Sequence, residues 1–224
     1  MHSCMTSNKH RREVVPASPL RPPAIFTADS LGLDFLNSVA TPVDREIDWI
    51  DSGEGLLAWL EQARLVPAEV LDGLRAQAIP RELDSVAAQA RKLREWFRTF
   101  VHAHRGRPLI AKDLEELEPL NRLLERDEAF GRIVGRDHGD HPGLQLRIMR
   151  RWRSPAALLL PIGDALAKFV SEEDFSKVKA CEGRPCTLMF VDQTRGGRRR
   201  WCSMAICGNR AKQAAHRHRL KAKH

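Results

Sequence analysis

Apolar residues recur at helical spacing along most of the chain between residues 25 and 171. The clearest pattern covers residues 81–104, where one face of a helix would collect Leu83, Val86, Ala87, Ala90, Leu93, Phe97, Phe100 and Val101. Shorter patterns predict further helices around residues 31–39, 51–60, 67–74, 113–126 and 154–171. Proline shapes two of them, because Pro67 suits a first helical position and Pro119 would bend the helix that contains it.

The hydrophobic pattern changes between the last two predicted helices. Residues 129–134 and 144–150 alternate with a period of two and flank a turn rich in Gly, Asp and His, which predicts a β-hairpin. Residues 1–24 contain four prolines among polar residues, which is typical of a disordered tail. We therefore predict a mainly helical α+β domain over residues 25–174, preceded by a disordered tail at residues 1–24.

Composition places the chain among ordinary soluble proteins, since 42% of its 224 residues are hydrophobic and 29% are charged. Its longest apolar stretch, residues 155–170, is interrupted by Pro161, Gly163, Asp164 and Lys168 and is too short to span a membrane. No apolar run follows the basic N-terminus, so a secretory signal is not expected. We expect a cytoplasmic protein.

The formal net charge of +8 is unevenly distributed. Residues 181–224 hold 11 Lys and Arg against Glu182 and Asp192, a balance of +9, so the other 180 residues together carry −1. A neutral body with a basic tail is typical of a protein that binds a polyanion, either nucleic acid or an anionic membrane surface. Nucleic acid is favoured, because residues 208–224 lack the apolar face of a membrane-surface helix.

Four of the five cysteines fall in this basic segment, while Cys4 lies in the tail. Cys181 and Cys186 form one close pair, Cys202 and Cys207 form another, and 15 residues separate the pairs. This pattern predicts a four-thiolate site for one zinc ion. The alternatives are two disulfides, which a reducing cytosol disfavours, and an iron–sulfur cluster. With all four positions filled by thiolates, the zinc would be structural.

The sequence around the cysteines predicts how the module folds. Gly183 and Pro185 suit a tight turn between the first two cysteines. Residues 188–191 are predicted to form a strand, and residues 198–201 a second strand that returns after a Gly-Gly turn. Ser203 is a candidate N-cap for a basic helix that could reach Leu220. We therefore predict a small treble-clef-like zinc finger over residues 175–224, with its helix facing phosphate.

Specific motifs in both parts resemble known families. Trp201-Cys202-Ser203-Met204 followed by Cys207-Gly208-Asn209-Arg210, with Phe190 and Asp192 before them, resembles the CGNR zinc finger over residues 178–219. Residues 31–38, Leu-Gly-Leu-Asp-Phe-Leu-Asn-Ser, with Trp59-Leu60 and Pro161-Ile162, resemble the ABATE domain over residues 26–170. The resemblance implies a stress-responsive bacterial transcription regulator that binds zinc and DNA.

Several residues are candidates for the functional site. We expect phosphate contacts from Arg198, Arg199, Arg200, Lys212 and Arg217, and base-edge contacts from Asn209 and Arg210. The alternative for the last two is structural, with Asn209 as a helix cap and Arg210 paired with Asp192. Asp34 and Asn37 lie three residues apart on one helical face, where they would either tie the nearby backbone or contact a ligand.

The sequence gives little support for catalysis. It has no phosphate-cradling Gly loop, nucleophile elbow or HExxH helix. His138 and His141 lie in the predicted turn, and His102 and His104 point to different sides of a helix without a local carboxylate motif. We therefore predict a protein that is not an enzyme.

We interpret the protein as a zinc-finger transcription regulator that binds double-stranded DNA on the nucleoid. Its N-terminal domain would sense a small-molecule effector or form a homodimer, and no membrane contact is expected. RNA binding or protein interaction through the same structural finger is the alternative.

Overall fold

The computed structural model describes residues 22–42, 45–77, 80–135 and 143–221. Its α-helices are α1 (Leu31–Leu36), α2 (Gly53–Gln62), α3 (Ala68–Gln77), α4 (Pro80–His104), α5 (Glu118–Leu124), α6 (Leu159–Glu172) and α7 (Asn209–Lys221). Its strands are β1 (Val39–Ala40), β2 (Ile47–Asp48), β3 (Ala129–Gly135), β4 (Leu144–Arg150), β5 (Val178–Ala180) and β6 (Met189–Val191). Among the described residues, no helix is both long and apolar enough to cross a bilayer.

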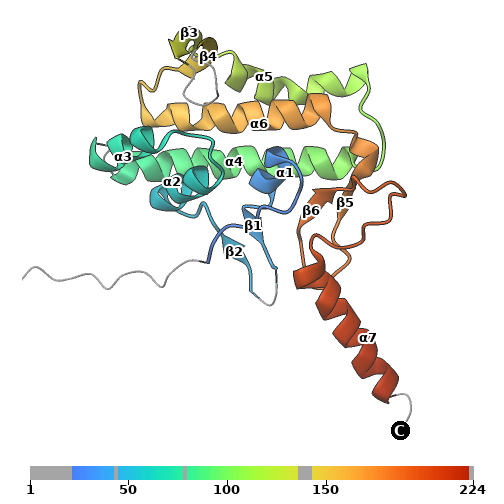
Figure 1. Ribbon diagram of the computed structural model, residues 1–224. Helices are drawn as coiled ribbons and strands as arrows, with labels where there is room; N and C mark the ends of the chain where they lie inside the picture. The colour runs from blue at the N-terminus through green and yellow to red at the C-terminus, as the bar shows by residue number, and fades with distance from the viewer. Residues whose placement is uncertain (1–21, 43–44, 78–79, 136–142, 222–224) are drawn as a thin grey trace, which may run out of the picture.

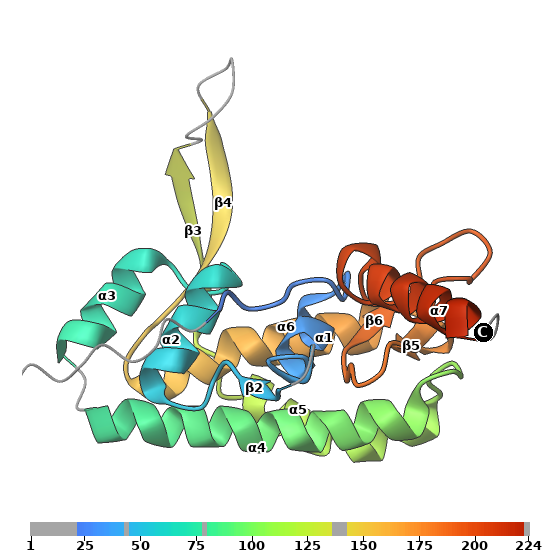
Figure 2. The same ribbon diagram turned by 90° about the horizontal axis from the view of Figure 1, so that it is seen from below.

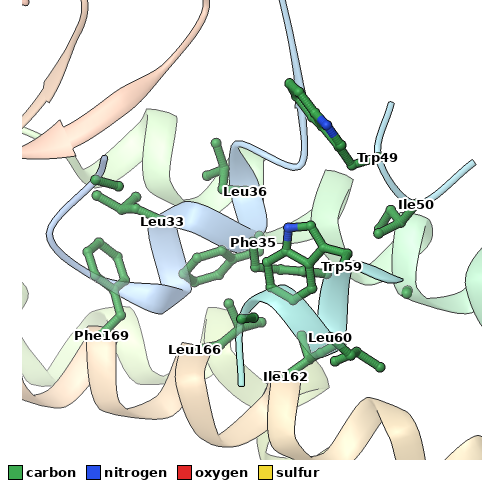
Figure 3. Packing of buried hydrophobic residues seen from close by; sticks show 14 of the residues in the cluster. Leu33, Phe35, Leu36, Trp49, Ile50, Trp59, Leu60, Ile162, Leu166 and Phe169 are labelled. Atoms are coloured by element: carbon green, nitrogen blue, oxygen red, sulfur yellow. The ribbon is translucent and has the colours of Figure 1, made fainter. Parts of the chain in front are cut away.

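Helices α4, α5 and α6 run side by side and form the body of the molecule (Figures 1 and 2). The short α1 packs against α6 and α4, and α2 packs along α4. Their shared core contains Phe35, Trp59 and Phe169 (Figure 3), and it also includes Phe97; all four side chains are almost fully buried. Gly32 allows α1 to approach α6 closely, because a Cβ at this position would lie 2.6 Å from the Cβ of Phe169.

The helices expected from the hydrophobic pattern are confirmed, with differences at their ends. The region 113–126 divides into a 3-10 helix (Ala111–Leu117) and α5, so the change of helix type falls just before Pro119. Helix α2 is capped by Ser52, whose hydroxyl accepts from Gly55 N. Helix α1 ends at Leu36, and Val39 belongs instead to the two-residue strand β1.

The predicted hairpin is confirmed as an antiparallel ribbon of β3 and β4, with Ile133 opposite Leu146. The ribbon projects from the helical body (Figure 2). Its connecting turn, with His138 and His141, lies outside the described residues, as does the tail up to residue 21. Pro22 and Ala24 are already bonded to the body, through Trp49 Nε1 and the Gln62 side chain respectively.

The sheet of the C-terminal module differs from the expected one. Strand β6 pairs with β5, with Lys179 opposite Phe190, and not with a strand at residues 198–201. That prediction was wrong because the first cysteine pair lies in the turn of the β5–β6 hairpin. Residues 198–200 have no strand pairing and lead into the second pair, with Arg200 O accepting from Glu182 N.

Candidate metal centre and nucleic-acid interface

The first cysteine pair closes the β5–β6 hairpin. Cys181 follows β5 directly, and its N–H extends the ladder by donating to Leu188 O at 2.9 Å. Cys186 N donates to Gly183 O at 2.6 Å, which tightens the turn between the two thiols. Gly183 is required here, because a Cβ would lie 2.8 Å from Cys207 Cβ and 3.1 Å from its sulfur. The turn therefore fits closely against the second pair.

The second pair begins the C-terminal helix. Cys202 precedes Ser203, and Ser203 O accepts from both Cys207 N and Gly208 N. Residues Met204–Gly208 form one turn of π-helix that continues directly into α7. The expected helix from Ser203 to about Leu220 is thus present. Its cap is made by the Ser203 backbone, because the hydroxyl makes no capping hydrogen bond.

The four sulfurs converge on one point in the geometry that zinc requires. All lie within 4.8 Å of one another, with Cys186 Sγ to Cys202 Sγ at 3.8 Å and Cys202 Sγ to Cys207 Sγ at 3.6 Å. A tetrahedral zinc site with Zn–S bonds near 2.3 Å requires S···S separations of about 3.8 Å. All four cysteines are free thiols, which removes the disulfide alternative. The cluster therefore fits one structural Zn²⁺.

Ionisation of the thiols also favours a bound cation. Hydrogen bonds from Cys186 and Cys202 lower the pKa of Cys181, and the same bonds raise the pKa of Cys202 and that of Cys186 to about 12. The close packing of the sulfurs therefore disfavours a state in which all four are thiolates and no cation balances their charge. A divalent ion removes this conflict, because a metal deprotonates its thiol ligands outright.

Arg210 lies at the metal centre. Its Nη2 is 3.1 Å from Cys207 Sγ, and its Nε is buried without a hydrogen-bond partner. A donor to a ligating sulfur orients the ligand and offsets its charge. The structure does not contain the alternative pair between Arg210 and Asp192. It also gives Arg210 a contact that competes with the expected role at a base edge.

Asp192 instead organises the loop before the second cysteine pair. Its carboxylate is fully buried and accepts from Lys179 Nζ at 2.7 Å, Thr194 N at 3.0 Å and Arg199 N at 3.0 Å. Burial alone would raise its pKa, but these donors hold the pKa well below its usual range. The loop between β6 and Cys202 is therefore fixed by an ionised carboxylate.

The side chain of Arg199 makes several contacts inside the protein, whereas Arg198 and Arg200 on either side of it are exposed. Its guanidinium pairs with Asp29, donates to Thr27 O at 2.8 Å and Cys202 O at 2.5 Å, and lies 4.2 Å from the centroid of the Phe190 ring. It therefore connects the finger to the segment before α1. These bonds compete with the phosphate contact expected of Arg199, because they already use its guanidinium donors.

Asn37 bonds α1 to the finger, and Asp34 fixes the segment that precedes α1. Asn37 Nδ2 donates to Met189 O at 2.8 Å, and its Oδ1 accepts from Met189 N at 2.9 Å, so α1 is bonded to strand β6. Asp34 Oδ1 accepts from Thr27 N and Ala28 N, both at 3.1 Å, and burial raises the pKa of this carboxyl to about 6. The geometry favours the structural interpretation of both residues over a ligand contact.

The remaining candidates for nucleic-acid contact lie on the surface. Arg198, Arg200, Asn209, Lys212 and Arg217 are exposed. Arg200 pairs with Glu182 and lies over the ring of half-buried Trp201, while Lys212 and Arg217 lie on α7. Asn209 makes only a 3.5 Å contact from Nδ2 to Ala205 O. Helix α7 extends from the finger away from the helical body (Figure 1).

Sequence reasoning missed one polar cluster at the end of α4. Buried His104 lies 3.1 Å from Glu116 and contacts Arg107, which forms a salt bridge with Asp113 at 2.8 Å. The sequence does not show this cluster, because His104 is paired with residues that lie beyond its own helix. Arg107 already neutralises Asp113, so the cluster ties α4 to the following 3-10 helix.

Two protein-family models match the chain. The first is the ABATE domain, described as "Putative stress-induced transcription regulator", over residues 29–173. The second is the CGNR zinc finger over residues 177–220. Neither is an enzyme family. No curated protein matches the chain.

Proposed function

Because the chain belongs to the ABATE family and ends in a CGNR zinc finger, we propose that it is a transcription regulator that binds duplex DNA through α7 and the adjoining loop. In this proposal the zinc ion holds the second cysteine pair in place and thereby fixes the start of α7. The protein would act in the cytoplasm, on the nucleoid.

The exposed positive charge of α7 carries this proposal. Lys212, Arg217 and Arg219 are exposed on this helix, and the sequence contains no Asp or Glu between Asp192 and His224. Apolar side chains contribute little, since the largest on the helix, Leu220, is 50% exposed. A helix of this kind gains little from packing against protein and is suited to phosphate.

The shape of α7 favours DNA over RNA. The helix has 13 residues, which corresponds to about 20 Å, and it projects from the molecule (Figure 1). The major groove of B-form DNA admits an α-helix, whereas the major groove of A-form RNA is too narrow and deep for side chains to read.

Attachment of the finger to the body would fix the direction of α7. The Asn37–Met189 pair and the contacts of Arg199 both cross from the ABATE domain to the finger, and Val191 N donates to Ala28 O at 3.0 Å. A change in the body near α1 would therefore reach the finger. This arrangement is what a regulator with a sensing N-terminal domain requires.

The test compares binding of the zinc-loaded full chain to duplex DNA and duplex RNA of the same sequence at matched salt. We expect DNA to bind more tightly and Arg217→Gln to lower the slope of log affinity against log salt by about 1. Arg81→Gln, at an exposed position of α4, is the matched control for charge. Equal or tighter RNA binding would refute the assignment to DNA.

We also propose that the β3–β4 ribbon mediates homodimer formation. The register places Ile133, Leu144, Leu146 and Ile148 on one face, and each is 68–72% exposed. We call these four residues the apolar stripe. The same face carries Gly131 opposite Ile148 and Gly135 opposite Leu144, and no charged residue in these three paired rows. An exposed patch of this kind is typical of an interaction site.

A second copy of the chain is the occupant that the stripe fits. Because the stripe is uncharged, it is complemented only by another apolar surface, and a twofold axis would bring the same residues together from both copies. Gly135 leaves room for a large side chain of the partner, since a Cβ at this position would meet nothing within 4 Å. A dimer would also place two fingers on DNA, which raises specificity.

Sedimentation of the full chain tests the dimer. The wild type should sediment as a dimer, and Ile133→Ser should shift it toward monomer. Arg132→Ser, on the opposite face of the same strand, should leave the distribution unchanged. A monomeric wild type, or equal effects of both substitutions, would contradict the proposal.

A further inference from the structure

A basic hollow lies between the end of α4 and the finger. It has a volume of about 700 Å³, and its walls include His102 from α4, Arg105 directly after α4, Lys179 from β5, and Arg198 and Arg200 from the loop before Cys202. The two walls are tied by Gly106 N, which donates to Phe175 O at 2.8 Å. The hollow is thus built from the ABATE domain and the finger together.

Two of the cations in this hollow are unpaired. Lys179 Nζ is bonded to Asp192 and Gly197 O, Arg200 is paired with Glu182, and Arg199 is paired with Asp29. The side chains of Arg105 and Arg198 have no hydrogen-bond or ion-pair partner among the described residues. Two arginines from different parts of the chain therefore line one space, and neither is paired with a carboxylate among the described residues.

The local field also favours an anion. The C-terminal end of α4 carries a partial negative charge of about half a unit, which two guanidinium groups outweigh. The pKa of His102 is lowered, first by burial and then by the positive charges of Arg105 and Arg98. Glu182, the carboxylate in the lining, is already neutralised by Arg200.

We propose that this hollow binds a phosphate group, held by Arg105 at the end of the body helix α4 and Arg198 from the finger, where Arg105 directly follows the last helical residue. Arginine suits this ligand because its planar fork donates two parallel hydrogen bonds to phosphate oxygens. The volume lies in the range of small-molecule sites and exceeds what one phosphate needs, so the group would belong to a larger molecule. That molecule is either the nucleic-acid backbone or a free phosphate-bearing metabolite.

The phosphate site can exist whether or not the protein binds DNA. If the phosphate belongs to DNA, the ABATE domain takes part in the interface next to the finger. If it belongs to a free metabolite, its binding bridges the two parts of the chain and offers a means of regulation. The site and its chemistry are the same in both cases.

The experiment titrates the zinc-loaded full chain with inorganic pyrophosphate and, separately, with duplex DNA. Arg105→Gln and Arg198→Gln each remove one unpaired guanidinium. Arg81→Gln changes a residue at the start of α4, and Arg105 directly follows the end of this helix, so the two arginines are about 36 Å apart at 1.5 Å per residue. Arg195→Gln is an exposed neighbour of Arg198 outside the lining, so these two variants are the matched controls.

We expect Arg105→Gln and Arg198→Gln each to weaken pyrophosphate binding by about tenfold or more, and the controls to bind as the wild type does. The pKa of His102, followed by NMR, should rise when pyrophosphate binds, because an anion favours the imidazolium. Thermal unfolding of each variant checks that the fold is intact.

The outcomes separate the sources of the phosphate. If Arg105→Gln also lowers the DNA salt slope by about 1, the hollow holds the DNA backbone. Pyrophosphate binding that depends on Arg105, without any effect on DNA, assigns a free ligand, and it does so even if DNA is not bound at all. If neither probe distinguishes Arg105→Gln from Arg81→Gln, the hollow is not a phosphate site.

Discussion

Arg199 provides the sharpest test of how the finger is attached, because sequence and structure give it different roles. The sequence places it in a run of three arginines suited to phosphate, whereas the structure directs it to Asp29, Thr27 O and Cys202 O. We consider Arg199→Gln, which removes the charge, and Arg199→Lys, which keeps the charge but loses the planar fork.

The size of the effect follows from these contacts. Hydrogen bonds to a charged group contribute about 1.5–3 kcal/mol each. The bonds to Thr27 O and Cys202 O are well formed, whereas the pair with Asp29 is half exposed and contributes little. We therefore expect Arg199→Gln to lower the free energy of unfolding by about 3–5 kcal/mol, and Arg199→Lys by about 2 kcal/mol.

Urea unfolding of the zinc-loaded chain measures the stability, and the salt dependence of DNA binding measures phosphate contacts. Both Arg199 variants should lose stability, and Arg199→Lys should keep the wild-type salt slope. Arg217→Gln should instead lower the slope of log DNA affinity against log salt by about 1 and change the free energy of unfolding by no more than about 0.5 kcal/mol. If Arg199→Lys is as stable as the wild type and Arg199→Gln lowers only the slope, the structural role of Arg199 is refuted.

Three further predictions follow from the contacts around α1 and the cysteines. Asn37→Ala leaves the buried N–H and C=O of Met189 without partners and should lower the free energy of unfolding by about 2–4 kcal/mol, whereas Gln89→Ala on exposed α4 surface should change it little. Burial raises the pKa of the Asp34 carboxyl from 3.8 to about 6, so the folded state binds a proton at this carboxyl more tightly than the unfolded state does. Protonation of Asp34 therefore stabilises the folded protein as pH falls from about 6 to 4. The wild type should therefore gain about 3 kcal/mol relative to Asp34→Asn over that range in urea melts, and a constant difference would refute the assignment. Cys202→Ser should abolish stoichiometric zinc binding, measured by metal analysis, and should reduce the helical signal in circular dichroism. The reason is that structural zinc supplies about 10–16 kcal/mol of folding free energy to such modules. One bound zinc per chain in this variant would contradict the four-thiolate site.

Local patterns determined what could be predicted from the sequence. The helix at residues 81–104, the β3–β4 ribbon and the cysteine pairs depend on spacing within one segment, and all were predicted correctly. The basic helix after Ser203 was predicted in the same way, but the π-helical form of its first turn was not.

Features that join distant segments could not be found in this way. Asn37 and Met189 are 152 residues apart, and Arg199 and Asp29 are 170 apart, so no periodicity connects them. The incorrect pairing of residues 198–201 with β6 has the same origin, because the Gly-Gly turn suggested a local hairpin while the true partner, β5, precedes the first cysteine. Exposure is also a tertiary property, so the alternation in β3 and β4 predicted strands without showing that the apolar stripe would face solvent.

Binding of the zinc-loaded full chain to duplex DNA across a salt series, repeated after removal of the metal by a chelator, tests the central proposal most directly. We expect affinity to fall steeply and linearly on logarithmic axes as salt rises, and to be lost on chelation, because zinc fixes the start of α7. Binding that survives chelation unchanged would mean that charge alone is sufficient. Absence of binding by the zinc-loaded chain at low salt would contradict the assignment to DNA.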